Sequence, residues 1–235
     1  MNIGNIYKFS PECCIDKKLS ITFINPYNFK LSALDKDYLN VLKQFDCVYI
    51  DGILLQKMAN YLYKKNYKRY SFDGNSLAPK FFSEAKERSL SVSFVGSRNG
   101  VASRAADIIN NKYNNIVKNS FSGYFKSEEE KNEVIRSLNL SEMIVIGMGA
   151  PDQDEFAIKV KNKYPDKLVI TCGGYFDQIV DGQNEAYYPK LINDFNLRFA
   201  YRVYKEPKRI LSRYLFDYLF FYKWALNELF NKRMQ

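Results

Sequence analysis

Short apolar runs alternate with helix-like segments along most of the chain, and this alternation constrains the fold more than any other feature. The expected strands are Leu19–Ile24, Cys47–Ile50, Ser91–Val95, Met143–Ile146 and Leu168–Thr171. The expected helices are Ala33–Gln44, Ile53–Lys64, Ser76–Arg88, Gly100–Lys112, Ser127–Leu138 and Pro151–Lys163. Such alternation predicts an α/β fold with a mostly parallel, Rossmann-like sheet flanked by helices.

The composition is basic and lacks histidine. The 235 residues carry 35 Lys and Arg against 26 Asp and Glu, a net charge of +9. A basic chain favours acidic partners such as nucleic acid, an anionic membrane or phosphorylated substrates. Without histidine, His-based triads and His metal ligands are excluded, and carboxylates become the expected acid–base groups. The spacing of Cys13, Cys14, Cys47 and Cys172 fits neither a zinc site nor a disulfide framework, so we expect buried thiols in a reducing cytoplasm.

Neither a signal peptide nor a membrane span is expected. Residues Met1–Leu19 lack an apolar segment, and no stretch reaches the roughly 18 uninterrupted apolar residues of a span. We therefore expect a protein that is soluble or peripheral to a membrane.

The composition changes near Leu191, which predicts an α/β catalytic domain over residues 1–190 and a helical appendage over residues 191–235. The appendage starts basic and ends in an aromatic stretch from Tyr214 to Phe230. Its candidate contacts to an acceptor phosphate or an anionic membrane are Arg202, Lys205, Arg209 and Arg213. Two interpretations fit: an interface with anionic lipid, or a helix packed on its own domain or on a sister subunit.

In parallel α/β sheets, ligands bind beyond the carboxyl ends of the strands, so the residues after each strand are candidate site residues. The most informative turn is Gly147-Met148-Gly149-Ala150-Pro151, which follows a strand and opens a helix. Glycine permits close approach of a ligand, and a helix N-terminus favours an anion. Gly96-Ser97 and Cys172-Gly173-Gly174 form similar turns. The alternative for each is a turn that binds nothing.

Several carboxylates lie near these turns. Asp51 ends a strand and could be a general base or the N-cap of the next helix. Asp177 could accept hydrogen bonds from a ribose or a sugar, or could cap a turn. Asp152 and Asp154 spell Asp-x-Asp, which could hold a divalent ion against a diphosphate, although acids in a first helical turn are also favoured by the helix dipole alone.

Taken in order, these elements resemble the WecG/TagA/CpsF family of bacterial glycosyltransferases, from about Ile21 to Tyr214. The elements that carry the resemblance are Asn25-Pro26, Asp51-Gly52, Arg69-Tyr70-Ser71-Phe72-Asp73, Phe94-Val95-Gly96-Ser97 with Gly100-Val101, Gly123-Tyr124-Phe125, Gly147-Met148-Gly149-Ala150-Pro151 with Gln153, Gly173-Gly174-Tyr175-Phe176-Asp177, and Tyr201-Arg202 with Lys205-Glu206-Pro207 and Arg209. The resemblance implies an inverting transfer of a sugar, commonly of the N-acetylmannosamine type, from a UDP-sugar to an undecaprenyl-type lipid pyrophosphate acceptor.

The resemblance also implies where the enzyme works and which residues act. It implies cell-surface polysaccharide synthesis in the bacterial cytoplasm at the inner face of the membrane, a possible homo-oligomer, and no metal or other cofactor. Asp51 matches the proposed base, Arg69 and Gln153 match catalytic-pocket residues, and the donor-binding candidates are Asn25, Gly96, Gly147, Gly149, Ala150, Gly173, Gly174 and Asp177.

The sequence departs from the family pattern at three places. Phe23 stands where the family often has Thr, Asp152-Gln153-Asp154 replaces Lys-Gln-Glu, and Tyr187-Tyr188-Pro189 replaces Arg-Ala-Pro. Two rival functions stay open: a metal-dependent Asp-x-Asp sugar-nucleotide transferase, and a basic nucleic-acid-binding module. The basic residues gather at one end of the chain rather than along it, so we do not expect a nucleic-acid partner.

Overall fold

A computed structural model describes residues 18–182 and 218–230 of the chain. Over these residues, one parallel sheet has the strand order β2-β1-β6-β5-β3-β4. The strands are β1 (Ser20–Ile24), β2 (Cys47–Ile50), β3 (Val92–Gly96), β4 (Val117–Phe121), β5 (Met143–Gly147) and β6 (Leu168–Thr171). The expected parallel α/β sheet is confirmed, whereas the expected domain boundary at residue 190 lies outside the described residues.

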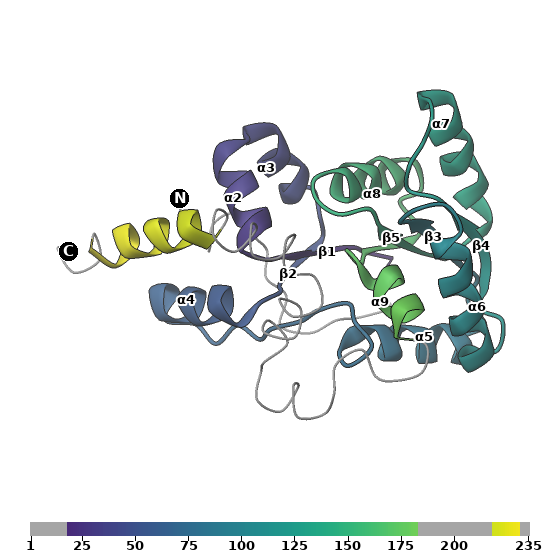
Figure 1. Ribbon diagram of the computed structural model, residues 1–235, viewed down its shortest axis with the longest axis horizontal. Coiled ribbons are helices and arrows are strands. Elements are labelled where there is room, and N and C mark those ends of the chain that lie inside the picture. Colours follow the sequence, from purple (N-terminus) through teal and green to yellow (C-terminus); the bar gives the residue numbers. More distant parts are fainter. Residues whose placement is uncertain (1–17, 183–217, 231–235) are drawn as a thin grey trace.

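Helices cover both faces of the sheet (Figure 1). One face packs against α5 (Leu77–Glu87), α6 (Val101–Tyr113) and α9 (Tyr175–Asp181). The other packs against α2 (Pro26–Leu34), α3 (Lys36–Lys43), α4 (Ile53–Tyr63), α7 (Glu128–Ser137), α8 (Asp152–Lys163) and a C-terminal helix at 218–230. A single 3-10 turn, Leu138–Leu140, follows α7.

Strand β5 shows why the strands are almost continuously apolar. Met143 and Val145 point into the core beneath α5, α6 and α9, while Ile144 and Ile146 point to the opposite face. All five residues of the strand are buried. A strand covered by helices on both faces has no polar side, so it reads as an apolar run rather than as an alternation.

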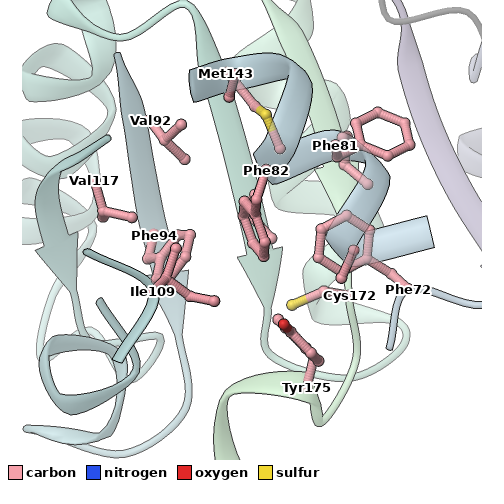
Figure 2. Close-up of a cluster of buried hydrophobic side chains, with 14 of the residues drawn as sticks. Phe72, Phe81, Phe82, Val92, Phe94, Ile109, Val117, Met143, Cys172 and Tyr175 are labelled. Atoms are coloured by element: carbon pink, nitrogen blue, oxygen red, sulfur yellow. The ribbon is translucent and has the colours of Figure 1, made fainter. Parts of the chain in front are cut away.

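Aromatic rings fill the core on the α5–α6–α9 side. Phe82 of α5 lies among the labelled side chains of Figure 2, with its ring centroid 5.9 Å from that of Phe94 and 5.8 Å from that of Phe72. At one end of the cluster lie Cys172, in the turn after β6, and Tyr175, the first residue of α9. This turn is therefore anchored directly to the core, and the strand end beside it has little freedom to move.

The expected helix Ala33–Gln44 corresponds to α3, which begins later, after Asp35, and a separate helix, α2, that was not expected precedes it. The first, α2, begins earlier: the Asn25 side chain accepts hydrogen bonds from the backbone N–H groups of Tyr27 and Asn28 as an N-cap, and Pro26 occupies the first helical position. The Asp35 backbone is extended, and its side chain caps α3. Asp35 ends one helix and starts the next.

Besides α2, the elements β4 and α9 were not expected from the sequence. Strand β4 lies at the sheet edge, and its sequence VKNSF is too polar to stand out as an apolar run. Helix α9 spans 7 residues and begins directly after Gly173-Gly174, the glycine pair that follows β6. Its buried Tyr175 and Phe176 are too close together to show a helical period.

The C-terminal helix packs on the domain rather than standing apart from it. Phe221 is fully buried, and its ring meets that of Phe29 edge-on at a centroid distance of 5.8 Å. The Trp224 ring lies 4.4 Å from the same Phe29 ring. The outward side of the C-terminal helix still exposes apolar side chains, namely Leu219, Tyr222, Leu226 and Phe230. Within residues 18–182 and 218–230, no helix has the length and hydropathy of a membrane span.

Two of the four cysteines, Cys47 and Cys172, lie in the described residues. Both are buried free thiols, as expected, and burial raises the pKa of Cys172 well above its ordinary value. Cys13 and Cys14 lie outside the described residues.

Candidate active site

The parallel sheet brings the candidate residues to one edge. Asn25 follows β1, Asp51 follows β2, Ser97 follows β3, and Gly173 follows β6, while Gly147 ends β5. Because all strands run in the same direction, these positions lie at their shared carboxyl edge, where α/β folds bind ligands. The parallel sheet thus places these candidates along one edge, and their role in binding stays a prediction.

Two of the candidate glycines pack backbone against backbone. A Cβ atom on Gly96 would lie 2.3 Å from the carbonyl oxygen of Gly147. One on Gly147 would lie 2.8 Å from the Gly173 carbonyl oxygen and 2.8 Å from the Cys172 sulfur. These distances are too short for any side chain at either position, so Gly96 and Gly147 allow neighbouring strand ends to touch. Close packing of the sheet accounts for these two glycines without a ligand.

The other glycines of the turns border open space. Among the residues that the structure describes, a Cβ atom on Gly149 or Gly173 would meet no atom within 4 Å, and one on Gly174 would meet only the Gln178 side chain at 4.0 Å. Gly149 and Gly173 have φ values of +81° and +56°, which non-glycine residues rarely adopt. At these positions the backbone is uncovered, as the approach of a ligand requires. Ala150, the residue after Gly149, is half-buried in the same turn.

Gln153 ties the two open turns together. Its side-chain oxygen accepts the N–H of Gly149 at 3.2 Å and the N–H of Gly173 at 3.1 Å. The side chain is 5% exposed. Because its oxygen is occupied by two backbone donors, the NH₂ group is the part of Gln153 left to donate to a ligand.

The N-terminus of α8 does not offer the free N–H groups that the sequence suggested. The N–H of Gln153 is bonded to the Gly149 carbonyl, and those of Asp154 and Glu155 are bonded to the Pro151 carbonyl. Pro151 itself is the N-cap rather than the first helical residue. Acidic Asp152 and Glu155 are exposed at this turn. These three N–H groups are therefore not available to an anion, and anion binding at this turn stays a prediction.

The backbone segments that carry Asp51 and Arg69 lie side by side at the end of β2. The Asp51 N–H donates to the Ile24 carbonyl at 2.7 Å, which fixes its backbone at the end of the sheet. Arg69 forms a parallel bridge with Ile50, and the Tyr70 N–H donates to the Ile50 carbonyl at 2.9 Å. The N-cap of α4 is Gly52, with no side-chain cap, so the capping role considered for Asp51 is excluded. Asp51 is half-buried.

Asn25 and Asp177 both have structural partners. The Asn25 oxygen caps α2, which leaves its NH₂ group for a ligand. Asp177 lies in the first turn of α9, where it accepts a hydrogen bond from the Ser97 hydroxyl at 2.8 Å. Ser97 holds a left-handed backbone, with a φ of +55°. Asp177 thereby links the turn after β3 to the turn after β6, and it is not the N-cap of α9, which is Gly174.

The Asp-x-Asp pair does not form a metal site. Asp152 is exposed, whereas Asp154 is completely buried with both oxygens engaged: one accepts from Thr22 at 2.5 Å and the other from the Tyr38 hydroxyl at 2.8 Å. The two carboxylates thus belong to different environments. Among the described residues, no group of three or more Cys, Asp or Glu side chains is placed to hold a metal ion.

A buried polar network around Asp154 lies outside what the sequence predicted. Thr22 also shares a hydrogen bond with Thr171 at 2.8 Å, and the Asn28 side chain donates to the Tyr38 hydroxyl at 2.9 Å. The network joins β1, β6, α2, α3 and α8 just behind the candidate site. Burial raises the pKa of Asp154 to about 6, although the two hydroxyl donors act in the opposite direction. In the sequence, the only indication of this network is Thr22, a polar residue within an apolar strand.

The basic candidates Arg202, Lys205, Arg209 and Arg213 lie outside the described residues, as does Tyr187-Tyr188-Pro189. Their assignment to an acceptor phosphate or a membrane stays a prediction.

Comparison with known proteins shows which family the chain resembles along most of its length. A model of the WecG/TagA/CpsF family of glycosyl transferases matches residues 9–235. A Shigella boydii protein named UDP-Gal:alpha-D-GlcNAc-diphosphoundecaprenol beta-1,4-galactosyltransferase is 35% identical over 223 residues, covering 92% of this chain and 91% of that protein. Two proteins named N-acetylglucosaminyldiphosphoundecaprenol N-acetyl-beta-D-mannosaminyltransferase are more distant. The one from Staphylococcus aureus (strain MRSA252) is 25% identical over 82% of this chain and 74% of its own length, and the one from Bacillus subtilis (strain 168) is 24% identical over 90% and 83%.

Proposed function

Because the chain belongs to the WecG/TagA/CpsF family and is therefore a glycosyltransferase, we propose that it transfers a hexose from a UDP-sugar to a diphosphoundecaprenol-linked sugar. The three relatives above are all named for acceptors of this type. The donor we would test first is UDP-galactose, since the 35% identical relative is named for it and the N-acetylmannosaminyl relatives are 25% and 24% identical. The products would enter a cell-surface polysaccharide.

The observation that carries the proposal is the backbone pairing that brings the Arg69 segment to the end of β2, where Asp51 follows at the carboxyl edge of the sheet. Asp51 is the general base: it takes the proton from the acceptor hydroxyl as the oxygen attacks the anomeric carbon. Arg69 would supply a positive charge at this edge and stabilise the negative charge that develops on the departing UDP.

A single displacement inverts the anomeric centre. UDP-hexoses of this type carry an α linkage, and the relatives are named for β products. One carboxylate base suffices for such a reaction, in contrast to the two carboxylates of a retaining double displacement. Inversion at Asp51 is the stereochemical part of the proposal.

The donor pocket would be built from the open turns. The NH₂ group of Gln153 and the uncovered backbone of Gly149, Gly173 and Gly174 border the same space, and Asn25 supplies a second amide NH₂. Gly96, Gly147 and Ala150 would hold these turns in place, and Asp177 would do so through Ser97. We propose metal-independent transfer because cations of the chain, Arg69 and the C-terminal Arg202 and Arg209, can offset the diphosphate charge.

The enzyme would work at the cytoplasmic surface of the bacterial membrane, where a lipid-linked acceptor presents its sugar. The 191–235 appendage would contribute to that contact, with Lys205 and Arg213 among its cations and the outward apolar side of the 218–230 helix as its described part. A homo-oligomer is compatible with this placement.

A transfer assay tests the proposal. Purified protein is incubated with a short-chain GlcNAc-diphospholipid and, separately, UDP-galactose, UDP-N-acetylmannosamine or UDP-N-acetylglucosamine, in EDTA and with manganese. We expect a β-linked disaccharide lipid from one donor at equal rates in both conditions. An α-linked product, or transfer that requires manganese, would contradict the mechanism, and no transfer from any UDP-sugar would contradict the function.

A further inference from the structure

Helix α4 starts at the proposed catalytic base and carries an exposed basic face. Its N-cap, Gly52, directly follows Asp51. Leu54, Lys57 and Tyr61 recur at the three- and four-residue spacing that places side chains on one side of a helix. All three are exposed, Tyr61 by 63%. A large aromatic ring left in solvent beside a lysine is typical of a contact surface.

The chain just after α4 extends this face with more positive charge. Lys64, Lys65 and Lys68 are exposed, and the next residue in the sequence is Arg69, one of the candidate site residues. From Ile53 to Phe72 the sequence contains no Asp or Glu. None of these lysines forms an ion pair with an acidic residue of the described part of the chain. We call Leu54, Lys57, Tyr61, Lys64, Lys65 and Lys68 the α4 face.

Helix α7 shows the contrasting arrangement, in which exposed charges pair with each other. In Figure 1 it lies at the far end of the molecule from α4, and its Glu128 pairs with Lys131 and Lys159, and its Glu133 with Arg136. The lysines of the α4 face have no such acidic partner among the described residues, so an anionic surface attracts this end of the molecule. That contact would bring Asp51 near the surface, because α4 begins two residues after Asp51.

We propose that the α4 face rests on the anionic phospholipid surface of a bilayer, as a contact separate from the C-terminal appendage. The lysines would pair with lipid phosphates, and Tyr61 would sit at the headgroup level, where Tyr is enriched. At about 1.5 Å per residue, α4 is on the order of 16 Å long, so a catalytic base at one of its ends stays near the membrane. The inference rests on the proposed function, since a lipid-linked acceptor holds its diphosphate at this level.

Vesicle co-sedimentation of the full-length protein tests the proposal. The vesicles contain phosphatidylcholine with phosphatidylglycerol, or phosphatidylcholine alone, at about 0.1 M salt, where exposed charges are screened beyond about 10 Å. The test variant is Lys57→Glu/Lys64→Glu/Lys65→Glu. The matched control is Lys112→Glu/Lys118→Glu/Lys163→Glu, which changes exposed lysines on α6, β4 and α8 and lowers the net charge equally. Circular dichroism melting establishes that each variant is folded.

We expect the wild type and the control to bind the mixed vesicles and the α4 variant to bind on the order of 100-fold more weakly, since each basic residue near the surface contributes about a factor of five. Tyr61→Ser should weaken binding by a smaller factor. Equal losses in the two triple variants, no loss in the α4 variant, or no wild-type binding would each overturn the proposal. Loss of self-association in the α4 variant, with vesicle binding intact, would instead assign the face to a second copy of the chain.

A soluble assay separates this proposal from the proposed function. With a short-chain acceptor and no membrane, the α4 variant should transfer sugar at the wild-type rate, because none of its three lysines is placed in the catalytic site. Failure of the wild type in that assay would contradict the proposed function and leave the vesicle result standing. A large rate loss in the α4 variant there would contradict the assignment of this face to the membrane.

Discussion

The side-chain oxygen of Gln153 accepts the backbone N–H of Gly173 at 3.1 Å, although the two residues belong to different turns. The same oxygen accepts the N–H of Gly149 at 3.2 Å. One buried amide thus fixes the spacing of the turns after β5 and β6 and still has an NH₂ group to offer. Gln153 has a structural role and, in our proposal, a binding role, and these can be separated by mutation.

Gln153→Glu and Gln153→Ala should differ. The glutamate keeps an acceptor for both glycine N–H groups but loses the NH₂ donor, so we expect weaker UDP binding with a small change in melting temperature. The alanine leaves two backbone donors unpaired, so we expect weaker binding and a loss of about 2 kcal/mol or more in the free energy of unfolding. Calorimetric titration with UDP and chemical denaturation measure the two effects. Unchanged UDP affinity in both variants would remove Gln153 from the donor site.

Asp154 should make the protein less stable as the pH rises. Its pKa is raised from 3.8 to about 6 in the folded chain, so the folded state binds this proton more tightly than the unfolded state does. The resulting stabilisation is fully present below pH 3.8 and is lost as the pH rises through about 6. At pH 7 the buried charge costs on the order of 3 kcal/mol relative to pH 4.

Asp154→Asn removes that titration. We expect the stability advantage of the variant over wild type to grow by up to about 3 kcal/mol as the pH rises from 4 to 7, because only the wild type loses stability over this range. Denaturation curves at several pH values measure the difference. Asp37→Asn on α3, where the carboxyl group is exposed, controls for the loss of one negative charge. A difference from wild type that does not change with pH would mean that Asp154 is ionised normally in the folded chain.

Gly96→Ala should lower stability, whereas Gly174→Ala should lower donor affinity with little change in stability. A Cβ atom on Gly96 would press on the Gly147 carbonyl oxygen at 2.3 Å, so we expect a loss of stability of about 3 kcal/mol or more. One on Gly174 enters nearly open space, at φ −86°, so stability should change by less than about 1 kcal/mol while affinity for the UDP-sugar falls. Melting temperatures and donor titrations compare them. A stable Gly96→Ala protein would contradict the close packing of β3 and β5.

Phe221→Ala should destabilise the whole domain, because Phe221 is fully buried against Phe29. Loss of a buried phenylalanine costs about 3–5 kcal/mol. Tyr222→Ala, at a neighbouring side chain that is 47% exposed, is the matched control and should change stability little. Truncation near Leu191 should therefore lower stability as well as transfer activity. Equal melting temperatures for both alanine variants would mean that the helix does not pack on the domain in solution.

The sequence predicted the sheet and most of its helices because buried parallel strands are apolar runs and long helices are periodic. It missed β4, because an edge strand can expose polar side chains such as Lys118, and it missed α2, whose apolar residues do not follow a clear helical period. It also started α3 too early, because Asp35 fits a helix face as well as a cap. For the site, the carboxyl-edge rule located Asp51 and the glycine turns. The hydrogen bonds of Gln153 and the burial of Asp154 depend on contacts between segments more than 15 residues apart, which local patterns do not contain.

The most direct test of the account is the rate of sugar transfer by Asp51→Asn, measured beside the wild type in EDTA with a UDP-sugar donor and a GlcNAc-diphospholipid acceptor. We predict a wild-type rate that EDTA does not change, and a loss of about 10²–10⁴-fold in kcat for the variant, with UDP affinity and melting temperature retained. A folded Asp51→Asn enzyme that transfers sugar at the wild-type rate would contradict the assignment of Asp51 as the catalytic base.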